Sequence, residues 1–242
     1  MSDLSDKTTI VVGASRGLGH GIATALAGAG EDVVAVSRTP AAFPAGVRLE
    51  IADAADPTVA ARLIDRYEPS AIVLVAGATP HMRPLQEQTW ETFSVNWQAD
   101  VHITFHWLRE ALLKPLRPGS RVVVFSSGAA LQGSPLSGGY AGAKAMQRFI
   151  AGYAQQEADR AGLELTFTGV LPRFAPMTGV GEAAVRAYAA RAGQSVEDYL
   201  QRRDPPLAPE IAGAAMVDLM RADAATVAPA YLLDGAGLQT LP

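Results

Sequence analysis

The 242-residue sequence contains no cysteine, no long apolar run and no cluster of basic residues. Without cysteine it cannot form disulfides, thiolate nucleophiles, Cys-ligated zinc sites or iron–sulfur clusters. No apolar run approaches the roughly 18 residues that a membrane-spanning helix needs. The formal net charge is −4, so a nucleic-acid-binding surface is not expected. We therefore expect a globular protein without membrane or nucleic-acid partners.

The first residues also lack the features of a secretion signal. Residues 1–7 have neither a basic start nor an apolar segment, and we therefore expect a cytoplasmic protein. Hydrophobic residues make up 49% of the chain and charged residues 18%, which excludes a disordered chain. The length allows one large α/β domain or two small domains.

Short β-branched segments alternate with longer alanine-rich segments along the chain. The strand candidates are residues 9–12, 33–36, 47–51, 71–75, 121–125, 163–170 and 230–233. The main helix candidates are residues 18–29, 57–67, 98–114 and 140–160. Continuously apolar strands that alternate with helices are typical of a parallel sheet covered on both faces. The sequence therefore predicts one α/β domain, residues 1–242, with a doubly wound parallel sheet.

Residues 173–206 interrupt this alternation. They are too few for a second domain, so we expect a small lid inserted over a substrate site. Its large side chains either line an apolar pocket or pack the lid onto the domain. These side chains are Phe174, Met177, Tyr188 and Tyr199.

The turn after the first predicted strand is rich in glycine, with the sequence Gly13-Ala14-Ser15-Arg16-Gly17-Leu18-Gly19. Small residues here let the backbone approach a pyrophosphate, and the following helix supplies amides and the positive end of its dipole. A tight turn between a strand and a helix would also explain the glycines. The position after the first strand of an α/β chain favours dinucleotide binding.

The end of the second predicted strand indicates which dinucleotide binds. The residue that contacts the ribose is expected about 20 residues after the glycines, where Ser37 and Arg38 lie. A carboxylate there would select NAD, whereas Ser37 and Arg38, together with Arg16, suit the 2′-phosphate of NADP. Arg38 could instead be a solvated arginine at a strand end. We predict that NADP(H) is preferred over NAD(H).

Tyr140 and Lys144 are four residues apart at the start of a predicted helix and therefore share one face. A phenol with an ordinary pKa near 10 is a poor acid–base catalyst at neutral pH. An ammonium about 4 Å away stabilises a phenolate by roughly 4 kcal/mol at an effective dielectric constant of 20. Ser127 follows a predicted strand, at the sheet edge where ligands bind in open α/β folds. A phenol and a hydroxyl together suit a carbonyl oxygen that gains negative charge.

This set of motifs resembles the short-chain dehydrogenase/reductase family over nearly the whole chain. The matching residues are Gly13, Gly17, Gly19, Asp53, Ala76-Gly77, Asn96, Ser126-Ser127, Tyr140, Lys144, Pro172 and Asp234-Gly235. The resemblance implies a Rossmann fold and an oxidoreductase that interconverts a carbonyl and a secondary alcohol by hydride transfer with NADP. It leaves the small-molecule substrate unidentified, and it implies a homotetramer or homodimer.

The resemblance also implies a role for each catalytic residue. Tyr140 would exchange a proton with the substrate oxygen, and Ser127 would polarise the same oxygen. Lys144 would hold the nicotinamide ribose and favour the phenolate of Tyr140. Asn96 would anchor a water that connects Lys144 to solvent.

The remaining residues of the resemblance belong to the cofactor site. Asp53 would contact the adenine, and the Ala76-Gly77 backbone would pack on the adenine-side ribose. Pro172 would lie beside the nicotinamide.

Four positions depart from the family pattern. Val12 and Val75 stand where the family often has Thr and Asn, whose side chains brace the cofactor loops. Arg173 replaces a glycine that permits close approach to the nicotinamide. Met177 replaces a threonine, and Thr178 follows it. Val12 and Val75 would weaken cofactor binding. Arg173 and Val75 leave open a catalytically silent NADP-binding sensor, and a fold relative with lyase or elimination chemistry is a third alternative.

Several other residues have two interpretations. His102 and His106 could form half of a metal site, but no third ligand is suggested, so we favour packing and predict no metal. His81 and Leu131-Gln132 follow strands at the ligand-binding edge. They are expected to border the substrate pocket, although solvated loop residues would look the same.

Overall fold

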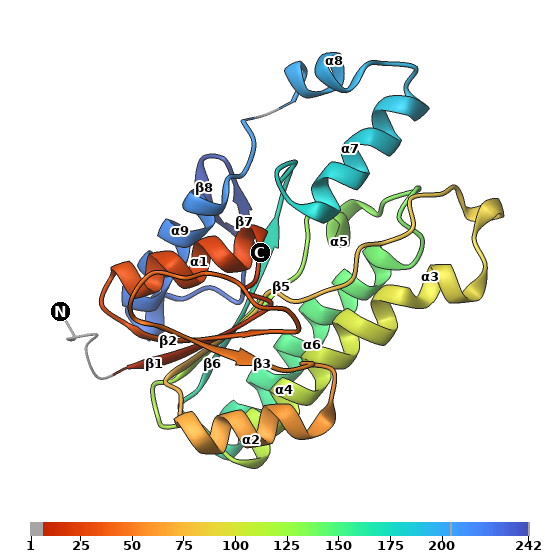
Figure 1. Ribbon diagram of the computed structural model, residues 1–242. Helices are drawn as coiled ribbons and strands as arrows, with labels where there is room; N and C mark the ends of the chain where they lie inside the picture. Colours follow the sequence, from red (N-terminus) through yellow and green to blue (C-terminus); the bar gives the residue numbers. More distant parts are fainter. Residues whose placement is uncertain (1–6, 204, 242) are drawn as a thin grey trace.

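The computed structural model describes residues 7–203 and 205–241, and this part of the chain forms one eight-stranded sheet between two layers of helices (Figure 1). The strands are β1 (Thr8–Val12), β2 (Asp32–Ser37), β3 (Val47–Ile51), β4 (Ala71–Leu74), β5 (Arg121–Phe125), β6 (Thr166–Pro172), β7 (Ala230–Asp234) and β8 (Gly237–Leu241). Their order is β3-β2-β1-β4-β5-β6-β7-β8. The chain crosses the sheet centre between β3 and β4, so the predicted doubly wound α/β fold is confirmed.

Two sets of helices cover the sheet. Helices α1 (Gly17–Gly28) and α9 (Pro209–Arg221) pack on one face, and α2 (Pro57–Tyr67), α4 (His102–Leu113) and α6 (Tyr140–Ala161) pack on the other (Figure 1). The remaining helices are α3 (Trp90–Asn96), α5 (Ala129–Gln132), α7 (Gly179–Arg191) and α8 (Val196–Gln201). Among the described helices, none is long and apolar enough to cross a bilayer.

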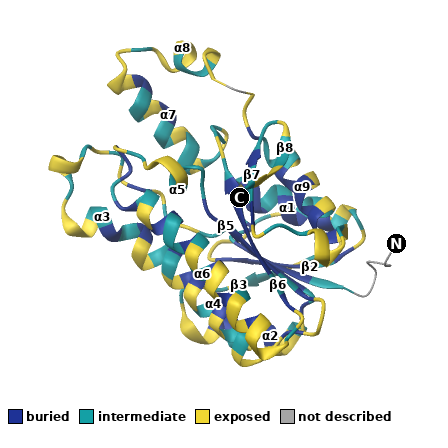
Figure 2. Ribbon diagram, turned by 180° about the vertical axis from the view of Figure 1, so that it is seen from behind, coloured by how far each residue is buried: buried dark blue, intermediate teal, exposed yellow. Residues whose placement is uncertain are grey.

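Alternate residues of each central strand enter opposite cores. In β1, Ile10 and Val12 pack with α2 and α4, whereas Val11 packs with α1 and α9. Figure 2 shows the strands as a buried layer and the outer helix surfaces as exposed. A strand that is covered on both faces is mostly apolar at successive positions, which explains the continuous runs in the sequence.

The sheet differs from its prediction at two strands. β8 was not predicted, and it pairs antiparallel with β7 at the edge of the sheet. The segment from Gly237 to Leu241 contains Gln239 and Thr240, and it therefore lacks the apolar run by which the buried strands were found. β6 begins at Thr166 rather than at residue 163, because Glu164 has a φ of 52°, which interrupts an extended chain.

The helix predicted for residues 98–114 begins earlier and is not regular. The Thr89 side chain accepts from the Thr92 N–H and thereby starts α3 at Trp90. Between α3 and α4 lies a π-helical turn, η2 (Trp97–Val101). Such turns often lie at functional sites, and this one contains the buried Asp100.

The segment predicted to be an inserted lid contains α7 and α8, which project beyond the carboxyl edge of the sheet (Figure 1). The side chain of Thr178 accepts from the Gly181 N–H at 3.1 Å and caps α7. The side chain of Ser195 accepts from the Asp198 N–H at 3.0 Å and caps α8.

Candidate active site

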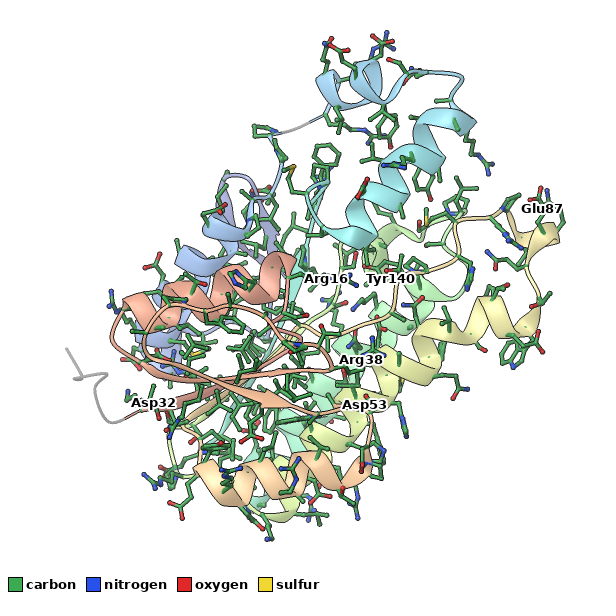
Figure 3. The ribbon with its side chains drawn as sticks, in the orientation of Figure 1. Arg16, Asp32, Arg38, Asp53, Glu87 and Tyr140 are labelled. Carbon is green, nitrogen blue, oxygen red and sulfur yellow. The ribbon has the colours of Figure 1, made fainter. Side chains whose placement is uncertain are left out.

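A cavity of about 610 Å³ opens where β1, β2, β4, β5 and β6 end. Every predicted site residue except Asn96 lines it. These residues are Gly13, Ser15, Arg16, Gly17, Leu18, Gly19, Ser37, Arg38, Asp53, Ala76, Gly77, Ser127, Tyr140, Lys144 and Pro172. Figure 3 shows Arg16, Arg38, Asp53 and Tyr140 gathered at this edge, although they come from distant parts of the sequence. The fold thus brings the residues predicted to bind a dinucleotide and the residues predicted to transfer a proton into one cavity.

The glycine turn is packed too closely for larger residues. Gly13 has a φ of +92°, and a Cβ there would lie 2.5 Å from the Ala76 nitrogen. A Cβ at Gly19 would lie 2.2 Å from the Gly13 carbonyl oxygen. Arg16 is the N-cap of α1 and makes no side-chain cap bond, so the first amides of α1 stay available at the cavity wall. This arrangement fits a pyrophosphate.

Two arginines line the part of the cavity next to β1 and β2. Arg16 and Arg38 are both exposed, and both line the cavity (Figure 3). Ser37 is buried, and its hydroxyl donates to the Thr39 carbonyl at 2.6 Å. Asp53, after β3, accepts from the Ala55 N–H at 3.1 Å. Two guanidinium groups beside one opening suit a phosphate more than an uncharged ribose.

The phenol and the ammonium lie on one face of α6, as the sequence predicts. The Lys144 Nζ is 5.6 Å from the centroid of the Tyr140 ring. Gly139 lets α6 start directly against α3, because a Cβ there would lie 2.3 Å from the Phe93 carbonyl oxygen. The Ser127 Oγ, which lines the same cavity, accepts from the Ala129 N–H at 3.2 Å.

Lys144 is buried and has three partners within the protein. Its Nζ lies 3.0 Å from the Asp100 Oδ2 and donates to the Gln147 Oε1 at 2.9 Å and to the Phe125 carbonyl at 3.3 Å. Two of these contacts are hydrogen bonds, and the third is an ion pair with the carboxylate. Burial lowers the pKa of Lys144, but the Asp100 carboxylate, together with the Tyr140 phenol, outweighs burial and raises that pKa above its ordinary value. The side chain therefore carries its charge at neutral pH.

Asp100 has no exposed surface and connects Lys144 to the loop after β4. Its Oδ1 accepts from the Ala78 N–H at 2.8 Å and from the Asn96 Nδ2 at 3.3 Å. The Asn96 Nδ2 also donates to the Ala78 carbonyl at 2.7 Å. The loop that lacks a polar side chain at Val75 is thus braced from η2 and α3.

The same network extends between α4 and α6. The Gln147 Nε2 donates to the Thr104 Oγ1 at 2.6 Å and to the Asp100 carbonyl at 3.1 Å. Asp100, Thr104 and Gln147 were missed by the sequence analysis. Their signal was spacing: Asn96, Asp100 and Thr104 recur every four residues, and Gln147 follows Lys144 by three, which places polar groups on buried helix faces.

Three of the departures from the family pattern, Val12, Arg173 and Met177, are not among the residues that line the cavity. Arg173 is exposed and is not among the lining residues, and its backbone N–H donates to the Leu233 carbonyl at 2.8 Å. Met177 is 75% exposed, whereas Thr178 lines the cavity. At this point of the chain the cavity wall is therefore formed by Thr178 and not by Met177.

The expected substrate-pocket residues divide into two groups. Phe174, Tyr188 and Tyr199 from the lid segment line the cavity. His81 is exposed and does not line it, whereas its neighbours Pro80 and Met82 do.

Leu131 and Gln132 were also expected at the pocket edge, and this prediction is wrong. Both are exposed and neither lines the cavity, because the short α5 turns its first residue, Ala129, toward it.

His102 and His106 lie beside each other on α4, with their Nε2 atoms 2.8 Å apart. Burial, together with the neighbouring charges of His102 and Arg109, lowers the pKa of His106. Within residues 7–203 and 205–241, no group of three His, Cys, Asp or Glu side chains is placed to hold a metal ion.

Comparisons with known proteins agree with this geometry. A family model described as short chain dehydrogenase matches residues 7–186. A short chain dehydrogenase from Mycobacterium avium shares 21% identity at a TM-score of 0.77, covering 100% of this chain and 87% of that one. Another from Burkholderia cenocepacia J2315, in complex with NADP, shares 18% identity at a TM-score of 0.75, covering 97% and 91%. No curated protein matches the sequence.

Proposed function

Because this chain belongs to the short-chain dehydrogenase family, whose members are NAD(P)-dependent oxidoreductases acting on CH–OH and C=O groups, we propose that it prefers NADP(H) and interconverts a small carbonyl compound and a secondary alcohol. One observation carries this proposal. A single cavity is lined both by a phosphate-binding turn with two arginines and by Ser127, Tyr140 and Lys144.

The residues present fit an NADP(H) molecule. The turn around Gly13 and the first amides of α1 would hold the pyrophosphate. Arg16 and Arg38 would pair with the 2′-phosphate, Asp53 would contact the adenine, and the Ala76-Gly77 backbone would pack on the adenine-side ribose. When bound, the nicotinamide supplies the hydride in reduction or accepts it in oxidation. Pro172 would lie beside the nicotinamide.

The chain's own residues would handle the proton. In reduction, the Tyr140 hydroxyl gives its proton to the substrate oxygen while the Ser127 hydroxyl donates a hydrogen bond to the same oxygen. In oxidation, the phenolate of Tyr140 takes the proton back. The Lys144 ammonium, 5.6 Å from the centre of the ring, lies close enough to interact with that phenolate.

The lid side of the cavity indicates the kind of substrate. Phe174, Val185, Tyr188 and Tyr199 form its wall together with Met82 from the loop after β4. These side chains are mainly apolar or aromatic, so a carbonyl compound with an apolar substituent fits them best. The Tyr188 hydroxyl accepts from the Leu136 N–H at 3.3 Å and lies 2.7 Å from the Ser134 Oγ, which ties α7 to the catalytic side.

We also propose that the protein assembles as a homodimer or homotetramer. Large side chains are exposed along η2, α4 and α6, where a second copy would cover them. They are Trp97, Phe105, Phe149 and Tyr153. Light scattering of the purified protein measures the number of copies.

Cofactor preference is tested by titrating the protein with NADPH and with NADH. We expect NADPH to bind at least about tenfold more tightly, and Arg38→Asp to remove most of that difference, because a carboxylate repels the 2′-phosphate. Arg160→Asp is the control, since Arg160 lies exposed near the far end of α6. Equal affinities in the unmodified protein refute the preference. NADPH binding without turnover of any carbonyl compound would favour the silent sensor instead.

A further inference from the structure

Lys144 pairs with a carboxylate to which the family resemblance assigns no role. We propose that Asp100 is a positioning residue that holds Lys144 and offsets its positive charge, so that Tyr140 releases its proton less readily than beside an unopposed ammonium. This inference rests on the proposed function, since it concerns the same tyrosine.

The carboxylate is fixed in place. Asp100 is wholly buried, and its Oδ2 lies 3.0 Å from the Lys144 Nζ. Its Oδ1 accepts from the Ala78 N–H and the Asn96 amide, and its own carbonyl accepts from Gln147 at 3.1 Å. Contacts to the loop after β4, to α3 and to α6 thus leave the side chain no room to turn away.

Hydrogen bonding alone does not require a charge at this position. The Gln147 Oε1 and the Phe125 carbonyl already accept two of the Lys144 donors, and an asparagine at position 100 could accept the third. A carboxylate in place of an amide must lose its hydration on burial, which is unfavourable by itself. What it adds is a negative charge next to the lysine.

The distances indicate how strong this charge is at Tyr140. The ammonium lies 5.6 Å from the ring centroid, and the carboxylate oxygen lies 3.0 Å from the ammonium. Laid end to end, these distances put the carboxylate within about 8.6 Å of the ring. Because charge interactions fall off inversely with distance, Asp100 offsets at least roughly two thirds of the effect of Lys144.

The other charged groups to be considered come from different elements. Arg16, Arg38 and Asp53 line the β1–β3 side of the cavity, and Arg173 follows β6 outside it. A substitution at position 100 changes none of them, so they cancel when two variants are compared. Tyr188 and Tyr199 also line the cavity and absorb as phenolates, and a Tyr140→Phe reference removes their signal.

The experiment is an absorbance titration of phenolate formation in the ligand-free protein. Subtracting the titration of Tyr140→Phe from that of the unmodified protein isolates Tyr140. The same subtraction in an Asp100→Asn background is expected to show a midpoint about one pH unit lower. Asp100→Glu, which retains the charge, is expected to keep the midpoint within about 0.3 pH unit of the unmodified protein.

Thr104→Val is the matched control, because it disturbs the same buried network without changing a charge. We expect it to leave the midpoint in place. An equal shift in Thr104→Val, or an unchanged or higher midpoint in Asp100→Asn, overturns the inference.

Asp100→Asn could fail to fold, and the comparison is then made in a Lys144→Met background, where no ammonium remains to be left unpaired. Adding Asp100→Asn there is again expected to lower the Tyr140 midpoint, and an equal midpoint overturns the inference. The titration needs neither cofactor nor substrate. Absent NADPH binding would therefore refute only the proposed function, whereas an unmoved midpoint in an active enzyme refutes only the role of Asp100.

Discussion

Replacing Lys144 by methionine is expected to lower the free energy of unfolding by about 3–5 kcal/mol, because it leaves a buried carboxylate without its counter-charge. Asp100 has no exposed surface, and only the Ala78 N–H at 2.8 Å and the Asn96 amide at 3.3 Å would still donate to it. Adding Asp100→Asn should recover at least about 2 kcal/mol, since the double variant contains no buried charge at this position. Urea unfolding at neutral pH, followed by circular dichroism, measures both values.

Lys114→Met is the matched control for this measurement. Lys114 pairs with Asp65 on the surface, with half of each side chain exposed, and such pairs contribute about 0–1 kcal/mol. If Lys144→Met costs no more than Lys114→Met, or if Asp100→Asn makes the Lys144→Met protein still less stable, the buried ion pair does not have the energetic role described above.

The difference in the free energy of unfolding between the unmodified protein and Lys144→Met depends on pH in a direction that the pKa of Lys144 sets. Burial by itself would lower the pKa of Lys144, but Asp100 raises it beyond the ordinary lysine value, so the folded protein holds this proton more tightly than the unfolded chain. The stabilisation is therefore fully present below about pH 10.4 and is lost as the pH rises through the higher folded value. The difference between the unmodified protein and Lys144→Met should stay constant from about pH 7 to 9 and narrow in stronger alkali.

Two further substitutions test other parts of the structure. Gly13→Ala is expected to weaken NADPH binding at least about tenfold, because its Cβ would lie 2.5 Å from the Ala76 nitrogen at a φ of +92°. Gly28→Ala is the control, because a Cβ there has no atom within 4 Å. It should leave the NADPH affinity measured by calorimetry unchanged. Unaltered binding by Gly13→Ala would remove the turn from the cofactor site. Glu31→Gln is expected to raise the melting temperature at pH 7 by about 1–3 °C, because burial raises the pKa of Glu31 and the folded protein loses stability as the pH rises through that value. The gain should vanish in scanning calorimetry below about pH 4, and a gain that persists there would contradict this assignment.

The strand–helix alternation predicted most of the fold because buried parallel strands must be apolar on both faces. The same criterion missed β8, an edge strand that contains polar residues and pairs on one side only. It also missed the π-helical turn, because a helix with one wider turn has nearly the same apolar spacing as a regular helix. The start of α3 was recoverable in principle from Thr89, whose capping box with Thr92 is a local signal.

At the site, the sequence predicted those residues whose roles follow from their position next to a particular strand or within one helix. The glycine turn, Arg38 and the Tyr140–Lys144 pair follow from their positions relative to strands and helices, and the structure brings them to one cavity. Asp100 was not predicted, because its role comes from its ion pair with Lys144, which lies in a different helix. For His81 the sequence left a pocket residue and a solvated loop residue open, because tertiary packing decides which side chains of a loop face a cavity.

Tyr140 is the residue on which the proposed chemistry depends, and NADPH consumption measures its contribution. The unmodified protein and Tyr140→Phe would be compared across ketones, aldehydes, quinones and β-ketoacyl thioesters, with Tyr153→Phe, an exposed tyrosine of the same helix, as control. Tyr140→Phe should bind NADPH as tightly as the unmodified protein but turn over its best substrate about 10²–10⁴ times more slowly. Turnover within about tenfold of the unmodified protein would show that another group transfers the proton.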